Sequence, residues 1–176
     1  RIQQKKQTMA LLNSLHRSTG LPKGDYTIQL PTGKYIGRAE IESEIFAPKP
    51  IVVRSTPFVW TVQPIKVKDG LERYNILPGS DAAGHWTAQG DGVYAFAAKV
   101  PGQDEASELI LQKARAGGYF IKQANETVAG HAKSGAWYVY KQDEFSPVFA
   151  GGKGAIMAVP FTFVAQKKTK GTNGIA

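Results

Sequence analysis

The interval from residue 38 to residue 49 concentrates charged side chains between two strand-like apolar segments, 35–36 and 51–53. It contains Arg38, Lys49 and the three glutamates Glu40, Glu42 and Glu44. A compact domain rarely keeps so long a connection without a use for it. Because proline restricts its own φ and the residue before it, "PKP" at 48–50 favours an extended exit. We therefore expect residues 40–49 to form an exposed, ordered loop offered to a partner. The alternative is a solvated charged surface.

A second candidate for partner binding is the segment "NETVAGHAKSG" at 125–135. In it Lys133 is followed by Ser134, and a trypsin-like specificity pocket holds a carboxylate that binds Lys or Arg. Lys133 and Ser134 are therefore an alternative reactive site. An ordinary Gly- and Ser-rich surface loop is the simpler interpretation of the same residues.

Residue types needed for catalysis or metal binding are scarce. The chain has no cysteine, and its three histidines, His16, His85 and His131, have no partner at helical metal-ligand spacing. No "GxSxG" motif is present, and the adjacent carboxylates at 104–105 and 143–144 are typical of soluble loops. We expect no enzyme activity, no catalytic residue, no metal and no cofactor.

The net charge of +8 lies mainly at the two ends of the chain. Residues 1–17 contribute +4 and residues 167–176 contribute +3, which leaves 15 basic and 14 acidic residues between them. A nucleic-acid-binding domain needs a basic stripe on its folded surface, so we expect no nucleic-acid partner. No apolar run is long enough to span a bilayer, so we expect no membrane partner either.

The two ends are expected to be peripheral to the folded body. Residues 1–20 form an N-terminal extension without an apolar stretch like that of a signal peptide, which favours a cytoplasmic location or non-classical secretion. Met9 is a candidate natural start, which would make residues 1–8 an addition. Residues 10–18 have the spacing of one or two helical turns. Residues 167–176 are expected to be a flexible basic tail.

The body between the ends repeats itself. Three sets of positions recur at spacings of 45 to 52 residues: Tyr26, Tyr74 and Tyr119; Tyr35, Trp86 and Trp137; and Trp60, Leu109 and Phe161. Segments that alternate at period two, bounded by Gly, Pro or Asp, are typical of strands. The expected strands are 25–30, 35–39, 50–54, 58–66, 72–78, 85–89, 93–99, 108–114, 118–123, 136–141, 147–151 and 160–166.

Three units of four strands predict an all-β protein, and closing the strands on themselves removes exposed edges. The architecture that we expect is a β-trefoil of twelve strands in three pseudo-symmetric units. In it six strands form a barrel and three hairpins cap one end, as a single domain over residues 21–166. A propeller is the other candidate, but three blades are too few. We expect a monomer.

The sequence resembles the mushroom (fungal) β-trefoil serine-protease inhibitors, which are analogues of the Kunitz-type trypsin inhibitors of plant seeds. The resemblance runs from Gly24 to about Gln166. It is carried by "GDYTIQL" at 24–30, "GR" at 37–38, "PKPIVV" at 48–53, "WTV" at 60–62, "YNI" at 74–76 and "FTF" at 161–163. The resemblance implies protein binding to a serine protease through surface loops, in a cytoplasmic or non-classically secreted protein without catalysis.

The resemblance also implies which residues bind. In this family the interval between "GR" and "PK" is a loop that enters the protease cleft, so the protease-binding loop comprises Arg38, Glu44, Ile45, Phe46 and Lys49. Its apex falls near Glu44 and Ile45, where the family often has a basic or amide residue. Glutamate at this place argues against trypsin as the target. Arg38 is placed to brace the loop, through Glu40 or Glu42.

A carbohydrate-binding or a protein-binding module of another kind is an alternative, because one fold serves many functions. A carbohydrate-binding, lectin-like trefoil would show Gln-x-Trp near the end of each unit, and this chain lacks the tryptophan there. Trp86 with Asp91 would be the aromatic platform and carboxylate of such a site, although Trp86 fits the core repeat better. Cysteine-protease inhibition through neighbouring loops is the closer alternative.

Overall fold

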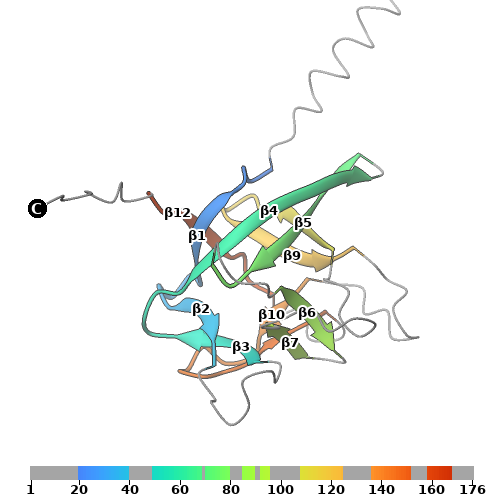
Figure 1. The fold of residues 1–176 in the computed structure, drawn as a ribbon. Coiled ribbons are helices and arrows are strands. Elements are labelled where there is room, and N and C mark those ends of the chain that lie inside the picture. Colours follow the sequence, from blue (N-terminus) through green and yellow to red (C-terminus); the bar gives the residue numbers. More distant parts are fainter. Residues whose placement is uncertain are drawn as a thin grey trace, which may run out of the picture.

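A computed structural model describes residues 20–39, 49–68, 70–79, 85–89, 92–95, 108–124, 136–151 and 158–167. These residues form twelve β-strands and no helix, so the protein is all-β over the described ranges, and no helix that could cross a membrane occurs in them (Figure 1). The predictions for residues 1–19 and 168–176 lie outside the described residues.

Each strand expected from the sequence overlaps one strand of the structure. The bounds are β1 Gly24–Gln29, β2 Tyr35–Arg38, β3 Lys49–Arg54, β4 Val59–Lys68, β5 Leu71–Leu77, β6 Trp86–Gln89, β7 Gly92–Ala95, β8 Leu109–Lys113, β9 Tyr119–Gln123, β10 Tyr138–Val139, β11 Val148–Phe149 and β12 Thr162–Ala165. The strands β10 and β11 have two residues each, where the sequence predicts six and five. Two residues of the predicted strands, Ala136 and Pro147, form isolated bridges to Lys122 and Val52 on other strands.

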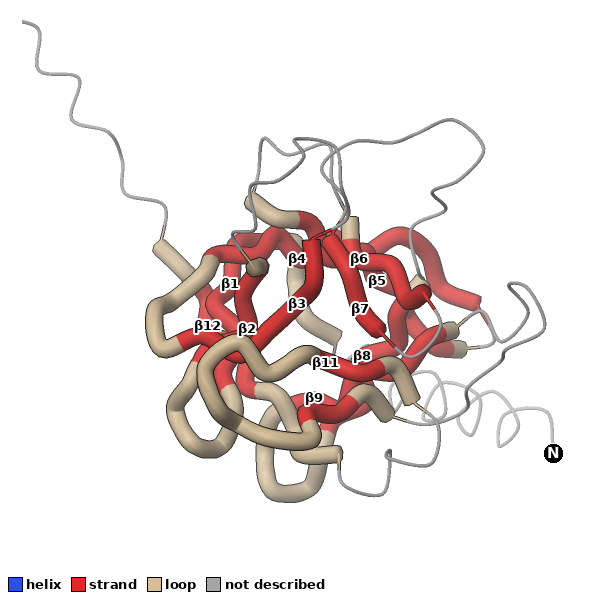
Figure 2. Tube along the Cα trace, turned by 90° about the horizontal axis from the view of Figure 1, so that it is seen from below, coloured by secondary structure: helices blue, strands red, loops and turns tan. Residues whose placement is uncertain are grey.

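One strongly curled sheet contains most of the strands. Antiparallel ladders link β12 to β1, β1 to β4, β4 to β5, β5 to β8 and β8 to β9. The sheet curls until β9 meets the residue before β12, where Tyr119 and Phe161 exchange two backbone hydrogen bonds of 2.8 and 2.9 Å. The curl can be followed in Figure 2.

A small second sheet is built from the hairpins. The β6–β7 and β10–β11 hairpins join it, and β3 connects it to the curled sheet because β3 pairs with both β2 and β7. The strand β11 also contacts β7 and lies next to β3 through the Val52–Pro147 bridge. The three hairpins β2–β3, β6–β7 and β10–β11 therefore meet one another (Figure 1).

The sequence repeats correspond to equivalent cross-strand pairs. The three pairs that lie opposite each other in the ladders are Tyr26 with Trp60, Tyr74 with Leu109, and Tyr119 with Phe161. The second member of each pair is fully buried, as are the isoleucines two residues after each tyrosine: Ile28, Ile76 and Ile121. Two of the three repeating sets thus describe the same pairing made three times.

The remaining repeating set is wrong by one residue in the first unit. Trp86 and Trp137 are buried and stack on each other with ring centroids 5.8 Å apart. In the first unit the buried residue is Ile36, whereas Tyr35 is only half-buried. Successive residues of a strand point to opposite faces, so a shift of one position exchanges core for surface.

Gly118 permits the contact at which the curled sheet meets itself. It has a φ of +73°, and a Cβ atom there would lie 2.7 Å from the carbonyl oxygen of Phe161. Gly117 has a φ of +94° but nothing within 4 Å of the same position. Substituting Gly117 therefore tests the cost of the left-handed backbone alone, whereas substituting Gly118 adds the cost of a clash with the Phe161 carbonyl oxygen.

We expect Gly117→Ala to lower the free energy of unfolding by roughly 1–2 kcal/mol, the cost of a left-handed conformation. Gly118→Ala should cost roughly 1–3 kcal/mol more, because the Phe161 carbonyl is backbone held in a hydrogen-bonded pair. Urea unfolding of both variants measures the difference. Equal losses would show that the contact at Phe161 carries no energetic weight.

The hydroxyls of two core tyrosines are both hydrogen-bonded, and that of Tyr26 reaches the start of the described chain. The Tyr26 hydroxyl donates to the Pro22 carbonyl oxygen at 2.9 Å, and the Tyr74 hydroxyl donates to the Glu72 carboxylate. Burial, with the proximity of Tyr119, raises the pKa of Tyr26 above its usual 10.0. Burial and the hydrogen bond to Glu72 raise the pKa of Tyr74 further.

These raised pKa values predict a loss of stability in alkali. Below the tyrosine pKa of the unfolded chain, both states keep the proton and the contribution is complete. As pH rises through about 10 towards the folded pKa values, the unfolded chain ionises first and stability falls. Between about pH 9 and pH 11 the unfolding free energy of Tyr74→Phe should fall less steeply than that of the wild type. Parallel slopes in denaturant titrations would contradict this.

Candidate functional site

The base of the predicted loop is fixed in both sheets. Strand β2 ends at Arg38 and β3 begins at Lys49, and the Ala39 N–H donates to the Pro50 carbonyl oxygen at 2.9 Å. Next to that hydrogen bond, Arg38 lies opposite Ile51 in the β2–β3 ladder. On the other side of β3, Lys49 lies opposite Ala95 of β7. The chain therefore leaves β2 and enters β3 at neighbouring, hydrogen-bonded positions.

The structure places only part of the predicted site. Arg38 and Lys49 lie at the two ends of the loop, whereas Glu44, Ile45 and Phe46 lie outside the described residues. The alternative site, Lys133 with Ser134, also lies outside them, as do Glu40 and Glu42, the expected partners of Arg38. These assignments stay predictions.

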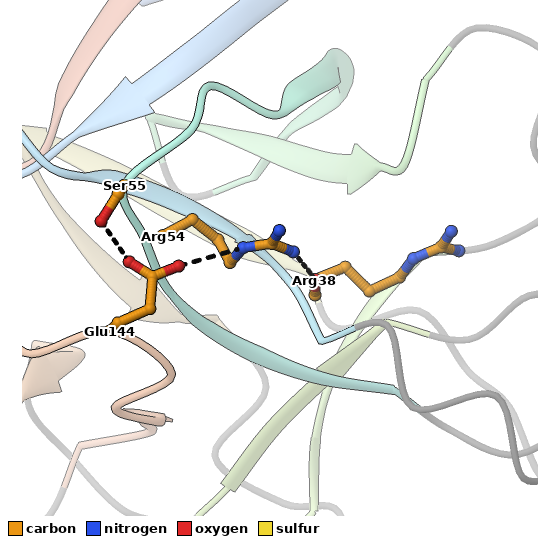
Figure 3. Close-up of polar contacts among 4 residues, drawn as sticks. All are labelled: Arg38, Arg54, Ser55 and Glu144. Atoms are coloured by element: carbon orange, nitrogen blue, oxygen red, sulfur yellow. Dashed lines mark hydrogen bonds and ion pairs between the residues drawn. The ribbon is translucent and has the colours of Figure 1, made fainter.

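Arg54, at the end of β3, supports the loop base. Its Nη1 donates to the Arg38 carbonyl oxygen at 2.9 Å, and its Nε lies 3.5 Å from Glu144 Oε1 (Figure 3). The Ser55 hydroxyl donates to the other oxygen of Glu144. Only 15% of the Arg54 side chain and 33% of the Glu144 side chain are exposed, so the pair is better shielded than a surface ion pair.

Arg38 contributes to the loop base mainly through its backbone. Its carbonyl oxygen accepts the hydrogen bond from Arg54, while its own side chain points away from Arg54 and Glu144 (Figure 3). The Arg38 guanidinium lies 5.8 Å from the centroid of the Phe58 ring, a cation–π distance. Arg54 thus braces the loop base from β3, and the bracing of the loop by Arg38 through Glu40 or Glu42 stays a prediction.

Gly37 makes room for this arrangement. A Cβ atom at Gly37 would lie 2.7 Å from Arg54 Cγ and 3.1 Å from Phe58 Cβ, both closer than ordinary contacts. With glycine there, the Arg54 stem crosses β2 directly and reaches the Arg38 carbonyl oxygen. The "GR" pair at 37–38 therefore has a structural reason, which is access for an arginine from the neighbouring strand.

The segment 140–147 lies against the same base. The Phe145 N–H donates to the Val53 carbonyl oxygen at 2.8 Å, and the Val53 N–H donates to the Ser146 carbonyl oxygen at 2.9 Å. The Phe145 ring lies under the Arg54 guanidinium at 5.5 Å, and Phe145 itself has a φ of +63°. Glu144 and Phe145 thus bind Arg54 from one side while Arg38 binds it from the other, which couples two loops of the molecule.

Sequence reasoning missed Arg54 and Glu144 because they are 90 residues apart in the chain. Neither residue lies in a motif, and Asp143 with Glu144 has the composition of an ordinary soluble loop. The only sequence signal for the contact is Gly37, whose role depends on a strand pairing that the sequence does not state.

Two other kinds of site receive no support from the described residues. Trp86 is 1% exposed and packed between Trp60 and Trp137, so the interpretation of Trp86 as a sugar platform is wrong. Its proposed carboxylate partner, Asp91, lies outside the described residues. Within the described part of the chain, no group of three His, Cys, Asp or Glu side chains is placed to hold a metal ion.

Comparisons with known proteins give a fold likeness. No protein-family model matches the chain, and no curated protein matches it. Among solved structures, it is similar to a salivary protein from Culex quiquefasciatus that belongs to the Cysteine and Tryptophan-Rich (CWRC) family. The TM-score is 0.61 at 13% identity, and the match covers 85% of this chain and 98% of that protein. At this identity the likeness concerns the fold alone.

Replacing Arg54 should loosen the loop base. We expect Arg54→Met to lower the unfolding free energy by about 1–3 kcal/mol, because the Arg38 carbonyl loses a donor and Glu144 loses its ion pair. The Ala39 amide, which closes the base, should exchange with solvent faster. Lys66→Met is the matched control, since it removes the ion pair between Lys66 of β4, a more exposed side chain than Arg54, and Glu108 beside β8. An unchanged exchange rate at Ala39 would show that Arg54 does not hold the base.

Proposed function

We propose that the curled sheet and its three hairpins form a β-trefoil. The support is threefold. Six strands follow one another round the curl, three hairpins meet one another, and an equivalent tyrosine-containing pair recurs in each unit. Superposition of the three units in an experimental structure, with Tyr26, Tyr74 and Tyr119 coinciding, is the expected outcome.

On this scaffold we propose inhibition of a serine protease through the loop of residues 40–49. The observation that carries the proposal is the fixed base, in which Ala39 is hydrogen-bonded to Pro50 and Arg54 holds the Arg38 carbonyl. A substrate-like inhibitor gains affinity when its binding segment is held before the complex forms, since less conformational entropy is then lost. Such a segment pairs its backbone with the enzyme while one side chain fills the specificity pocket.

Glu44 sets the expected target. By the resemblance to the fungal inhibitors, Glu44 lies near the loop apex, where a carboxylate is repelled by the buried carboxylate of a trypsin pocket. A serine protease whose pocket carries positive charge is the complementary partner. We propose a binding protein without catalytic activity that acts as a monomer, in the cytoplasm or after non-classical secretion.

A panel of trypsin, chymotrypsin, a glutamyl endopeptidase and papain tests this function. The expected result is strongest inhibition of the glutamyl endopeptidase and weak inhibition of trypsin. Inhibition of papain alone would support the cysteine-protease alternative. Tight trypsin inhibition that disappears in Lys133→Ala would move the reactive site to Lys133 and Ser134. Inhibition of none of the four enzymes would contradict the proposal.

A further inference from the structure

A hollow of about 300 Å³ lies on the third hairpin, and it is open to solvent. Its lining consists of Tyr138, Tyr140, Lys141, Ser146, Pro147 and Phe149. The core-facing residues of the same hairpin are Val139 and Val148, both buried. Because side chains alternate along a strand, the aromatic residues on either side of these valines come to lie on the outer face.

The aromatic part of the hollow is built into the strands. Tyr138 lies directly opposite Phe149 in the ladder, and their rings stack with centroids 5.4 Å apart and planes inclined by 23°. Phe149 is also paired with β7, and Pro147 bridges to Val52 of β3. Tyr140 is 64% exposed and stands beside this pair. The site is therefore preformed, as ligand pockets usually are.

The polar groups of the lining restrict the ligand. Lys141 supplies an ammonium group, and Tyr138, Tyr140 and Ser146 supply hydroxyls, all of which can donate. Among the described residues that line the hollow, no side chain is a carboxylate or an amide. A sugar brings many hydroxyl donors, and the described lining offers them only the three hydroxyl oxygens as side-chain acceptors. The complementary ligand is apolar, rich in acceptors and poor in donors.

We propose that this hollow binds an extended, proline-containing peptide. A prolyl segment has carbonyl acceptors but no N–H donors, and its rings pack against aromatic side chains in the polyproline II conformation. The Tyr138–Phe149 pair and Tyr140 provide the aromatic walls, while Lys141 and the hydroxyls donate to the peptide carbonyls. The inference does not depend on protease inhibition, since none of the described residues that line the hollow belongs to the segment 38–49.

The experiment titrates the full chain with an acetylated and amidated oligoproline peptide, followed by NMR and calorimetry. We expect saturable binding to the wild type, with shifted signals from Tyr138, Tyr140 and Phe149. Tyr140→Ala should weaken binding about tenfold, since an aromatic wall is lost. Lys141→Met should weaken it less. Leu71→Ala, which truncates an exposed apolar side chain of the β4–β5 hairpin, should bind like the wild type.

Two controls keep the proposal open to refutation. The same peptide built from D-proline forms the mirror-image helix and should not bind. Unfolding curves should show that Tyr140→Ala, at an exposed position, is folded, so that a loss of binding reports on the hollow. The proposal is overturned if binding does not approach saturation at roughly 5 mM peptide, because the dissociation constant would then be too high for a specific site. Equal binding of the D-peptide, full binding by Tyr140→Ala, or a glycan array hit that depends on Tyr140 would overturn it as well.

Discussion

Trp60→Ala should lower the free energy of unfolding by about 3–5 kcal/mol, the usual cost of truncating a buried aromatic side chain. Trp60 is 0% exposed, and its ring centroid lies 4.5 Å from that of Phe58 and 4.9 Å from that of Trp86. The indole N–H also donates to the Ile36 carbonyl oxygen at 2.7 Å. The substitution therefore removes packing and leaves a buried acceptor without its donor.

Guanidinium unfolding measures this loss. One further variant separates the packing contribution from that of the hydrogen bond, and another is an exposed control. Trp60→Phe keeps most of the packing but not the donor, so its cost should be about 1–3 kcal/mol, that of an unsatisfied buried group. Val67→Ala removes a largely exposed side chain from the same strand and should change stability by no more than about 0.5 kcal/mol. Similar losses in Trp60→Ala and Val67→Ala would mean that Trp60 is not part of the core.

Trp60 also connects the core to the candidate site. The carbonyl that it binds belongs to Ile36, and the next two residues are Gly37, which Arg54 crosses, and Arg38, whose carbonyl Arg54 binds. Phe58 packs on Trp60 on one side and lies beneath the Arg38 guanidinium on another. The position of β2, and with it one end of the loop, thus depends on a core tryptophan of β4.

The strands could be predicted because their information is local. Period-two alternation and bounding Gly, Pro or Asp residues mark each strand within about ten residues of sequence. The repeats added long-range information, since Tyr26, Tyr74 and Tyr119 each lie opposite a buried partner at one fixed place in their unit. In the first unit the repeat predicts a buried Tyr35, but the buried residue is its neighbour Ile36. A shift of one residue along a strand moves a side chain from the core face of the sheet to the solvent face.

The candidate site could be predicted only in outline. The ends of the loop follow from strand positions, whereas a stiff exit at Pro48 and Pro50 stays a prediction, since Pro48 lies outside the described residues. The support from Arg54 and Glu144 depends instead on the β2–β3 pairing and on the place of segment 140–147 beside β3. A side chain that acts across the fold leaves no local signal. For the same reason the hollow on the third hairpin appears only after the strands are paired.

Glu44→Arg should convert a poor trypsin ligand into a good one. A trypsin-like pocket holds a buried carboxylate, which repels Glu44 and would pair with arginine. The gain expected is about 2–5 kcal/mol, the range found when one member of a desolvated charge pair is removed. Glu40→Arg makes the same change of charge within the segment but away from the expected apex, and it should gain little. Inhibition constants for the wild type and both variants give the comparison.

The fixed base predicts a further dependence. If the loop gains affinity from being held at Ala39 and Pro50, Arg54→Met combined with Glu44→Arg should lose part of the gain, because ordering must then occur on binding. The loss should appear mainly in the dissociation rate, as most affinity changes within one interface do. Equal gains in Glu40→Arg and Glu44→Arg would indicate a general charge effect without a pocket-directed residue. Tight wild-type inhibition unaffected by either change would place the reactive site outside this loop and make Lys133 the next residue to replace.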